Sequence, residues 1–145
     1  MSLHNHALYQ VATKALIFND TKLLVLRTPD GYVDFPGGRV DETERAIPWT
    51  DALLREVAEE LGTDIKIEIN QTLFVSKRQY QKEGHVNYIA AIFFASRYVS
   101  GDITLSDEHG SFEWMTVEEL LNGNHQFVSD DERAQLHNYV AQNNI

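Results

Sequence analysis

The sequence contains no cysteine, which excludes disulfide bonds, zinc sites built from cysteine, and thiol nucleophiles. This absence suits a reducing compartment, and we expect a cytoplasmic protein. Proline and glycine are also few, at three and eight residues, and they are too scattered to form an interdomain linker. Domains commonly have roughly 150 residues. The length of 145 residues therefore predicts a single domain over residues 1–145.

Basic residues are scarce as well, with 12 Lys and Arg against 22 Asp and Glu and a net charge of −10. A field of this sign repels nucleic-acid backbones and anionic membrane surfaces, so we expect neither polymeric nucleic acid nor a membrane as a partner. The longest apolar run, Tyr88 to Ala95, is far shorter than the roughly 20 residues that span a bilayer. A small phosphorylated substrate stays open, provided that metal ions reverse the local charge.

Four segments have the composition or alternation typical of β-strands. They are Val11 to Phe18, Leu23 to Leu26, residues 65–69, and Val86 to Tyr98. Helix signals occur at three places. They are Trp49 to Leu61 with Gly62 as a stop, the capping box of Thr116 and Glu119, and that of Ser129 and Glu132. This order predicts an α/β (α+β) domain in which a mixed β-sheet lies between helices.

Acidic residues concentrate around the Trp49 to Leu61 helix. Between Val40 and Glu68, nine acidic residues stand against three basic ones, so this window carries −6 of the total charge of −10. On a helical wheel, Glu56, Glu59 and Glu60 share one arc. The opposite arc is apolar and is predicted to enter the core. It comprises Leu53, Leu54, Val57, Ala58 and Leu61.

Clustered carboxylates repel one another when they are ionised, so either solvent or cations must compensate for them. For the helix alone, a solvated acidic face is the simpler interpretation. A metal site is the alternative, since Mg²⁺ and Mn²⁺ prefer oxygen ligands. The preceding turn, Phe35-Pro36-Gly37-Gly38-Arg39, favours the alternative. Paired glycines permit close approach of a ligand to the backbone, and their carbonyl oxygens are available to a cation.

Together, the turn and the helix resemble the signature of the Nudix hydrolase family, which reads Gly, five residues, Glu, seven residues, Arg-Glu-aliphatic-any-Glu-Glu-any-Gly-aliphatic. Gly38 and Glu44 have the first spacing, and the segment from Arg55 to Gly62 matches the helical part in full. The sequence departs at two points. Three extra residues separate Glu44 from Arg55, and Thr63 stands where an aliphatic residue is usual. We expect the insertion to lengthen the loop, and it leaves open whether Glu44 still reaches Arg55.

The resemblance implies a Nudix-type α/β/α sandwich and a pyrophosphohydrolase that acts on phosphoric anhydrides. Such an enzyme cleaves the diphosphate linkage between a nucleoside and another moiety, by attack of metal-activated water. The implied cofactor is Mg²⁺ or Mn²⁺, with more than one ion in the substrate complex. The implied metal ligands are Glu56, Glu59, Glu60 and the carbonyl of Gly37. Arg55 and Glu44 are implied to form an ion pair that orients the carboxylates.

Two glutamates compete for the role of general base. Glu59 lies on the acidic helix, whereas Glu108 lies in a polar loop before Glu113, where some family members carry a catalytic glutamate. We favour Glu108, because such a loop can close over bound substrate. The adjacent His109 is interpreted as a bystander.

Groups that could bind a phosphorylated substrate are few near the expected site. Arg27, Arg39 and Arg78 would supply guanidinium groups for phosphate oxygens, and Gly38 would permit close backbone approach. An ordinary surface charge is the alternative interpretation of each arginine.

The expected partner is a small-molecule diphosphate, in the first instance a nucleotide, and a homodimer is compatible with the sequence. Two other functions stay open: a catalytically silent nucleotide-binding Nudix module, and a hydrolase of a non-nucleotide diphosphate. The intact Glu56, Glu59 and Glu60 argue against the silent module, because a domain without catalysis has no use for mutually repelling carboxylates.

Overall fold

The computed structural model describes residues 5–143, which form a mixed β-sheet between helices. The strands are β1 (Gln10–Asn19), β2 (Lys22–Arg27), β3 (Val33–Asp34), β4 (Gly37–Arg39), β5 (Lys66–Lys82), β6 (His85–Ser100) and β7 (Ser111–Thr116). The helices are the short 3₁₀ helix η1 (Glu42–Glu44), α1 (Trp49–Leu61), α2 (Val117–Asn122) and α3 (Asp130–Asn143).

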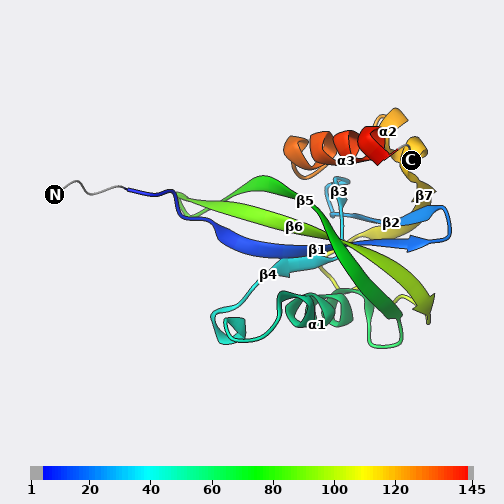
Figure 1. The fold of residues 1–145 in the computed structure, drawn as a ribbon, viewed down its shortest axis with the longest axis horizontal. Coiled ribbons are helices and arrows are strands. Elements are labelled where there is room, and N and C mark those ends of the chain that lie inside the picture. Colours follow the sequence, from blue (N-terminus) through cyan, green and yellow to red (C-terminus); the bar gives the residue numbers. More distant parts are fainter. Residues whose placement is uncertain (1–4, 144–145) are drawn as a thin grey trace.

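Strand β1 organises the sheet, whose main strand order is β3-β2-β1-β6-β5. It runs parallel to β6 and antiparallel to both β2 and β4. Its early residues, Ala12 to Lys14, pair with β4, whereas Phe18 and Asn19 pair with β2. Helix α1 covers one face of the sheet, and α2 and α3 cover the other (Figure 1). The fold is therefore the predicted α/β/α arrangement with a mixed sheet.

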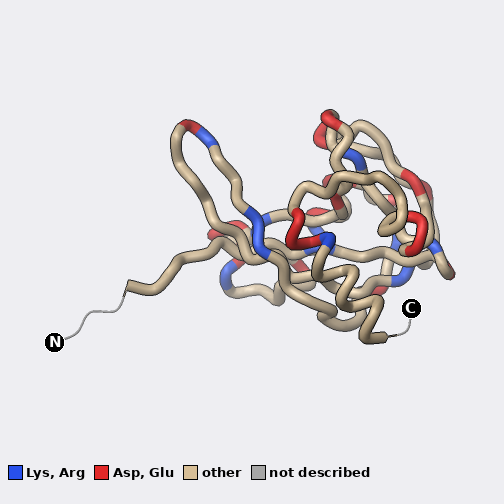
Figure 2. Tube along the Cα trace, turned by 90° about the horizontal axis from the view of Figure 1, so that it is seen from above, with Lys and Arg blue, Asp and Glu red and all other residues tan. Residues whose placement is uncertain are grey.

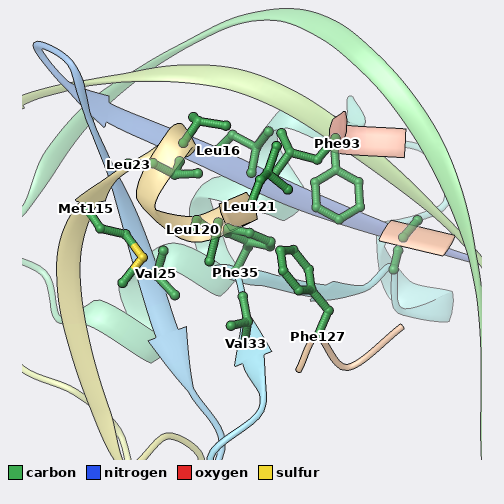
Figure 3. Packing of buried hydrophobic residues seen from close by; sticks show 14 of the residues in the cluster. Leu16, Leu23, Val25, Val33, Phe35, Phe93, Met115, Leu120, Leu121 and Phe127 are labelled. Carbon is green, nitrogen blue, oxygen red and sulfur yellow. The ribbon is translucent and has the colours of Figure 1, made fainter. Parts of the chain in front are cut away.

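Two apolar clusters, one on each face of the sheet, form the core. Between the sheet and the α2–α3 layer, Phe35 packs edge-on against Phe93 and also contacts Phe127 (Figure 3). Beneath the other face, Leu53, Val57 and Leu61 of α1 pack against strand residues. The alternation of β1 explains the division, because neighbouring residues of a strand point to opposite faces.

Helix α1 has the predicted limits, but its buried face differs from the predicted one. Leu54 is 45% exposed, whereas Glu60 is only 3% exposed. The buried face of α1 is thus rotated relative to the predicted one. It includes Leu53, Val57 and Leu61 and also the carboxylate of Glu60. The wheel assigned Leu54 inward from its apolar side chain alone. The direction in which the sheet and the Phe35–Gly38 turn approach the helix decides the outcome.

Strands β5 and β6 form a long hairpin that extends away from the body of the molecule (Figure 2). The sequence predicted a strand only over residues 65–69, because the polar residues that follow lack a regular alternation. In the structure, β5 continues to Lys82 as the terminal strand of the sheet. The start of α3 covers its edge: Lys77 donates its N–H to Asp131, and the Lys77 carbonyl accepts from Ser129 Oγ.

Of the two remaining helices, only α2 has its predicted capping box in full, formed by Thr116 and Glu119. At α3, the N–H of Glu132 lies 3.4 Å from Ser129 Oγ. The Glu132 carboxylate pairs with Arg78 instead of accepting from the Ser129 N–H, so the second half of that box is not formed. No helix within residues 5–143 is long and apolar enough to cross a bilayer. The expected domain of residues 1–145 includes six terminal positions outside the described residues.

The rotated face of α1 predicts a contrast between two neighbouring leucines. Replacement of Leu53, which is fully buried, by alanine should lower the free energy of unfolding by about 2–5 kcal/mol, because it leaves a cavity. The same replacement of Leu54 should cost less than about 1 kcal/mol. Urea denaturation followed by circular dichroism measures both, and equal losses would contradict the assigned face.

Candidate functional site

In the turn between β3 and β4, the backbone lies too close to its neighbours to leave room for ordinary side chains. Gly37 has φ +136°, and an added Cβ would lie 1.9 Å from the carbonyl oxygen of Thr13. A Cβ on Gly38 would lie 2.6 Å from Oε1 of Glu56. Only glycine fits at Gly37, so the backbone of the turn packs directly against β1, and at Gly38 it lies against the side-chain carboxylate of Glu56 from α1.

Glu44 does reach Arg55 despite the insertion. The guanidinium Nε and Nη2 of Arg55 donate to the two carboxylate oxygens of Glu44, each at 2.7 Å. Hydrogen bonds from Arg55 hold the pKa of Glu44 below its ordinary value. The insertion does not prevent this contact, because η1 places Glu44 next to α1. The additional residues lie in the loop between η1 and α1 and in the first turn of α1. This bidentate ion pair fixes the orientation of the Arg55 guanidinium.

Arg55 also compensates for two carboxylates of its own helix. It lies 3.1 Å from Oε1 of Glu56 and, through Nη1, 3.1 Å from Oε2 of Glu59. Glu59 is exposed, so this contact is a weak one. Burial raises the pKa of Glu56 against the opposing effect of Arg55. The predicted repulsion along the acidic face is thus relieved in part by one shared cation.

Glu60 lies apart from Arg55 and is buried against the glycine turn. Its Oε2 accepts a hydrogen bond of 3.1 Å from the N–H of Gly37. Burial raises the pKa of Glu60 to about 7, although the charge of Lys14 and the Gly37 hydrogen bond oppose the rise. A solvated acidic face is therefore the wrong interpretation for Glu60. Its carboxylate lacks enough polar partners to be ionised at its ordinary pKa, so a cation would be bound favourably.

The carbonyl of Gly37, the fourth implied ligand, is engaged by a residue that the sequence analysis did not select. Lys14 of β1 is 4% exposed, and its Nζ lies 3.2 Å from this oxygen. The signal in the sequence was a lysine in the middle of an otherwise apolar strand. Within residues 5–143, no three His, Asp or Glu side chains already converge as a metal site.

The loop that carries Glu108 is tied to the end of α1. The N–H of Thr104 donates to the carbonyl of Leu61, and the N–H of Ser106 donates to that of Glu60, both at 2.9 Å. Glu108 itself is exposed. The interpretation of His109 as a bystander does not describe its position, because its side chain is 5% exposed and its Nε2 lies 3.5 Å from Asp34. A buried imidazole thus anchors the far side of the loop.

The three candidate arginines have different environments. Arg27 is paired with Glu113 at 2.7 Å. Arg78 is nearly buried and is paired with both Asp34 and Glu132. Arg39 is exposed beside Gly38, and its guanidinium lies 5.0 Å from the ring centre of Tyr80. Arg39 is therefore the most accessible of the three, and the guanidinium groups of Arg27 and Arg78 are already paired with carboxylates.

Comparisons with known proteins bear on the family and the fold of the chain. The family model described as NUDIX domain matches residues 8–136. A MutT protein from Methanosarcina mazei Go1 is 24% identical, with a TM-score of 0.76 over 94% of this chain and 96% of that one. A MutT NUDIX hydrolase from Burkholderia pseudomallei is 25% identical, with a TM-score of 0.67 over 90% and 98%. An ADP-ribose pyrophosphatase from Streptococcus suis 89-1591 is 18% identical, with a TM-score of 0.67 over 94% and 92%.

The raised pKa of Glu60 predicts a pH-dependent effect of Glu60→Gln on the metal-free protein. The native carboxyl keeps its proton up to about pH 7, whereas the unfolded one ionises near 4.5, so wild-type stability should fall as the pH rises between these values. Above pH 7, Glu60→Gln should be the more stable by up to about 3 kcal/mol. Near pH 4.5 the difference should nearly vanish.

Urea denaturation in EDTA at pH 4.5, 6 and 8 measures this difference. Glu59→Gln is a matched control, since Glu59 is an exposed carboxylate one position earlier on the same helix. A constant offset between wild type and Glu60→Gln at all three pH values would contradict the assigned environment.

Proposed function

Because the chain belongs to the NUDIX domain family, whose model matches residues 8–136, we propose that it is a metal-dependent pyrophosphohydrolase that cleaves a diphosphate linkage in a nucleotide-type substrate. The observation that carries the proposal is the buried carboxylate of Glu60 beside the Gly37–Gly38 turn. The name of the ADP-ribose pyrophosphatase structure supports a nucleotide-type substrate. The cysteine-free sequence supports action in the cytoplasm.

The carboxylates of α1 fit a divalent ion. Burial raises the pKa of both Glu56 and Glu60, which means that each carboxylate lacks counter-charge in its ionised form. All the available donors are oxygens, as Mg²⁺ and Mn²⁺ prefer. Glu59 is exposed and held only by Arg55, so its side chain can turn away at little cost. We therefore assign Glu56, Glu59 and Glu60 as the residues that would hold the ion.

A bound divalent ion would screen the phosphate charges, lower the pKa of water and stabilise the departing oxyanion. The chain's own residues do the positioning. Arg55, held by Glu44, orients Glu56, and the N–H of Gly37 orients Glu60. Gly37 is buried, whereas Gly38 is partly exposed next to the Glu56 carboxylate, and Arg39 is the accessible cation beside it. Glu108 is the favoured acceptor of the proton that the attacking water loses, with Glu59 as the competitor.

Metal-dependent hydrolysis is the first expected outcome. A screen of nucleoside triphosphates, nucleotide sugars, ADP-ribose and non-nucleotide diphosphates, with Mg²⁺ or EDTA, should show phosphate or diphosphate cleavage only with the metal. Glu60→Gln should lower kcat by about 10²-fold or more, because it removes a charged ligand while keeping the size.

The same screen separates the alternatives. Tight nucleotide binding without turnover of any substrate would favour the silent module. Turnover confined to the non-nucleotide compounds would show that the substrate is a non-nucleotide diphosphate and not a nucleotide. Glu60→Gln with wild-type turnover would contradict the assignment of Glu60 as a ligand.

The general base is tested by comparing Glu59→Gln with Glu108→Gln at saturating Mg²⁺. The variant that lacks the base should lose turnover and the acidic limb of the pH profile, and it should keep its metal affinity. A variant that lacks a metal ligand should bind metal more weakly. Normal turnover by Glu108→Gln would make Glu108 an ordinary loop residue, and the role would pass to Glu59 or to a metal-bound hydroxide alone.

A further inference from the structure

Lys14 is a buried cation at the centre of the candidate site. Its Nζ donates to Oδ1 of Asp34 at 3.2 Å, to the carbonyl of Phe35 at 3.0 Å and to the carbonyl of Gly37 at 3.2 Å. An ammonium group has three donors, so each N–H has one oxygen acceptor. The three oxygens surround Nζ much as ligands surround a bound cation, and they all come from one segment, Asp34 to Gly37.

The surroundings supply this buried ammonium with a counter-charge and with hydrogen-bond acceptors. A buried ammonium is costly unless it is paired and hydrogen-bonded, and Lys14 is both. Although burial acts to raise the pKa of Asp34, the charges and hydrogen bonds of Lys14, His109 and Arg78 hold it well below its ordinary value. Asp34 is therefore a stable counter-ion for Lys14, and this ion pair holds the Lys14 side chain at the turn.

This position conflicts with the metal ligand set that the family resemblance implied. The Gly37 carbonyl was expected to bind a metal ion, yet it already accepts from Lys14. A divalent ion on the same oxygen would lie within a few ångströms of the ammonium in a dry environment, where like charges repel strongly. The lysine is braced by three contacts, so it is not easily displaced.

We propose that in this chain Lys14 takes the place of a metal ion on the Gly37 carbonyl, so that metal ions are left to the carboxylates of Glu56, Glu59 and Glu60. The inference rests on the proposed function for the presence of a metal. Lys14 is then a positioning residue. Its ammonium fixes the carbonyl of Gly37, and the N–H of the same residue fixes Glu60. Removal of the ammonium leaves the Gly37 carbonyl oxygen free to bind a metal ion and makes the net charge of the site more negative.

One carbonyl resonance reports this directly. Gly37-Gly38 is the only Gly-Gly pair in the sequence. In protein labelled only with [1-¹³C,¹⁵N]glycine, an HNCO spectrum therefore contains a single cross-peak, which joins the Gly38 amide to the Gly37 carbonyl. On addition of Mg²⁺, the carbonyl resonance should stay in place in the wild type and should move in Lys14→Met. An equal movement in both proteins would overturn the proposal.

Metal binding gives a second readout that does not depend on turnover. Lys14→Met should bind Mn²⁺, followed by electron paramagnetic resonance without substrate, at least about fivefold more tightly than the wild type, or should bind one more ion. Lys22→Met is the matched control, because Lys22 is an exposed lysine at the start of β2 and its loss changes the net charge equally. Its affinity should stay within about twofold of the wild type. Unchanged or weaker binding by Lys14→Met would overturn the proposal.

The two proposals can fail separately. Absence of hydrolysis in every substrate screen refutes the proposed function, whereas the inference about Lys14 is decided by the carbonyl resonance and by Mn²⁺ binding. If Lys14→Met does not fold, the wild-type spectrum decides. Binding of Mg²⁺ to the wild type is measured separately by calorimetry. If the chemical shift of the Gly37 carbonyl changes in parallel with that binding curve, the inference is refuted. If the chemical shift stays constant, the inference is supported.

Discussion

The Phe35–Gly38 turn fits between β1 and α1 only because Gly37 has no side chain. A Cβ there would overlap the carbonyl oxygen of Thr13. Since the backbone of the turn comes this close, its polar groups meet side chains from both neighbouring elements, Lys14 from the strand and Glu60 from the helix. The arrangement of charge at the site therefore follows from a steric constraint on main-chain packing, and any residue larger than glycine would separate these groups.

The carboxylates on and beside the acidic helix form two groups with different means of compensation. Glu44, Glu56 and Glu59 all contact Arg55, so one guanidinium offsets three carboxylates. Glu60 receives nothing from Arg55 and is placed instead beside a main-chain N–H. Burial raises the pKa of both Glu56 and Glu60, but only Glu56 has a guanidinium as a direct partner. A metal ion would thus have its largest effect on Glu60.

The sequence predicts this molecule well where a pattern is local. The limits of α1 follow from its periodicity and from Gly62, and the cap of α2 follows from Thr116 and Glu119. It predicts poorly where the outcome depends on what approaches from elsewhere. Burial of Glu60 in place of Leu54 depends on the direction in which the sheet meets the helix. A helical wheel contains no such information.

Lys14 and His109 illustrate the same limit for the candidate site. Neither belongs to the family signature, and each acquires its role from residues remote in the sequence. A buried lysine in a strand has no spacing rule that identifies its acceptors. In contrast, the Glu44–Arg55 contact could be anticipated from the signature, and the insertion changed the path between the two residues without separating them.

The first turn of α3 has a consequence beyond the stability of the helix. Strand β5 is terminal in the sheet, and a terminal strand exposes unpaired N–H and C=O groups on which another chain can build. At Lys77 both groups are taken, by Asp131 and Ser129. The start of α3 therefore interrupts this edge about two-thirds of the way from Lys66 to Lys82. Each remaining stretch is shorter, so a second chain could pair with only part of the strand.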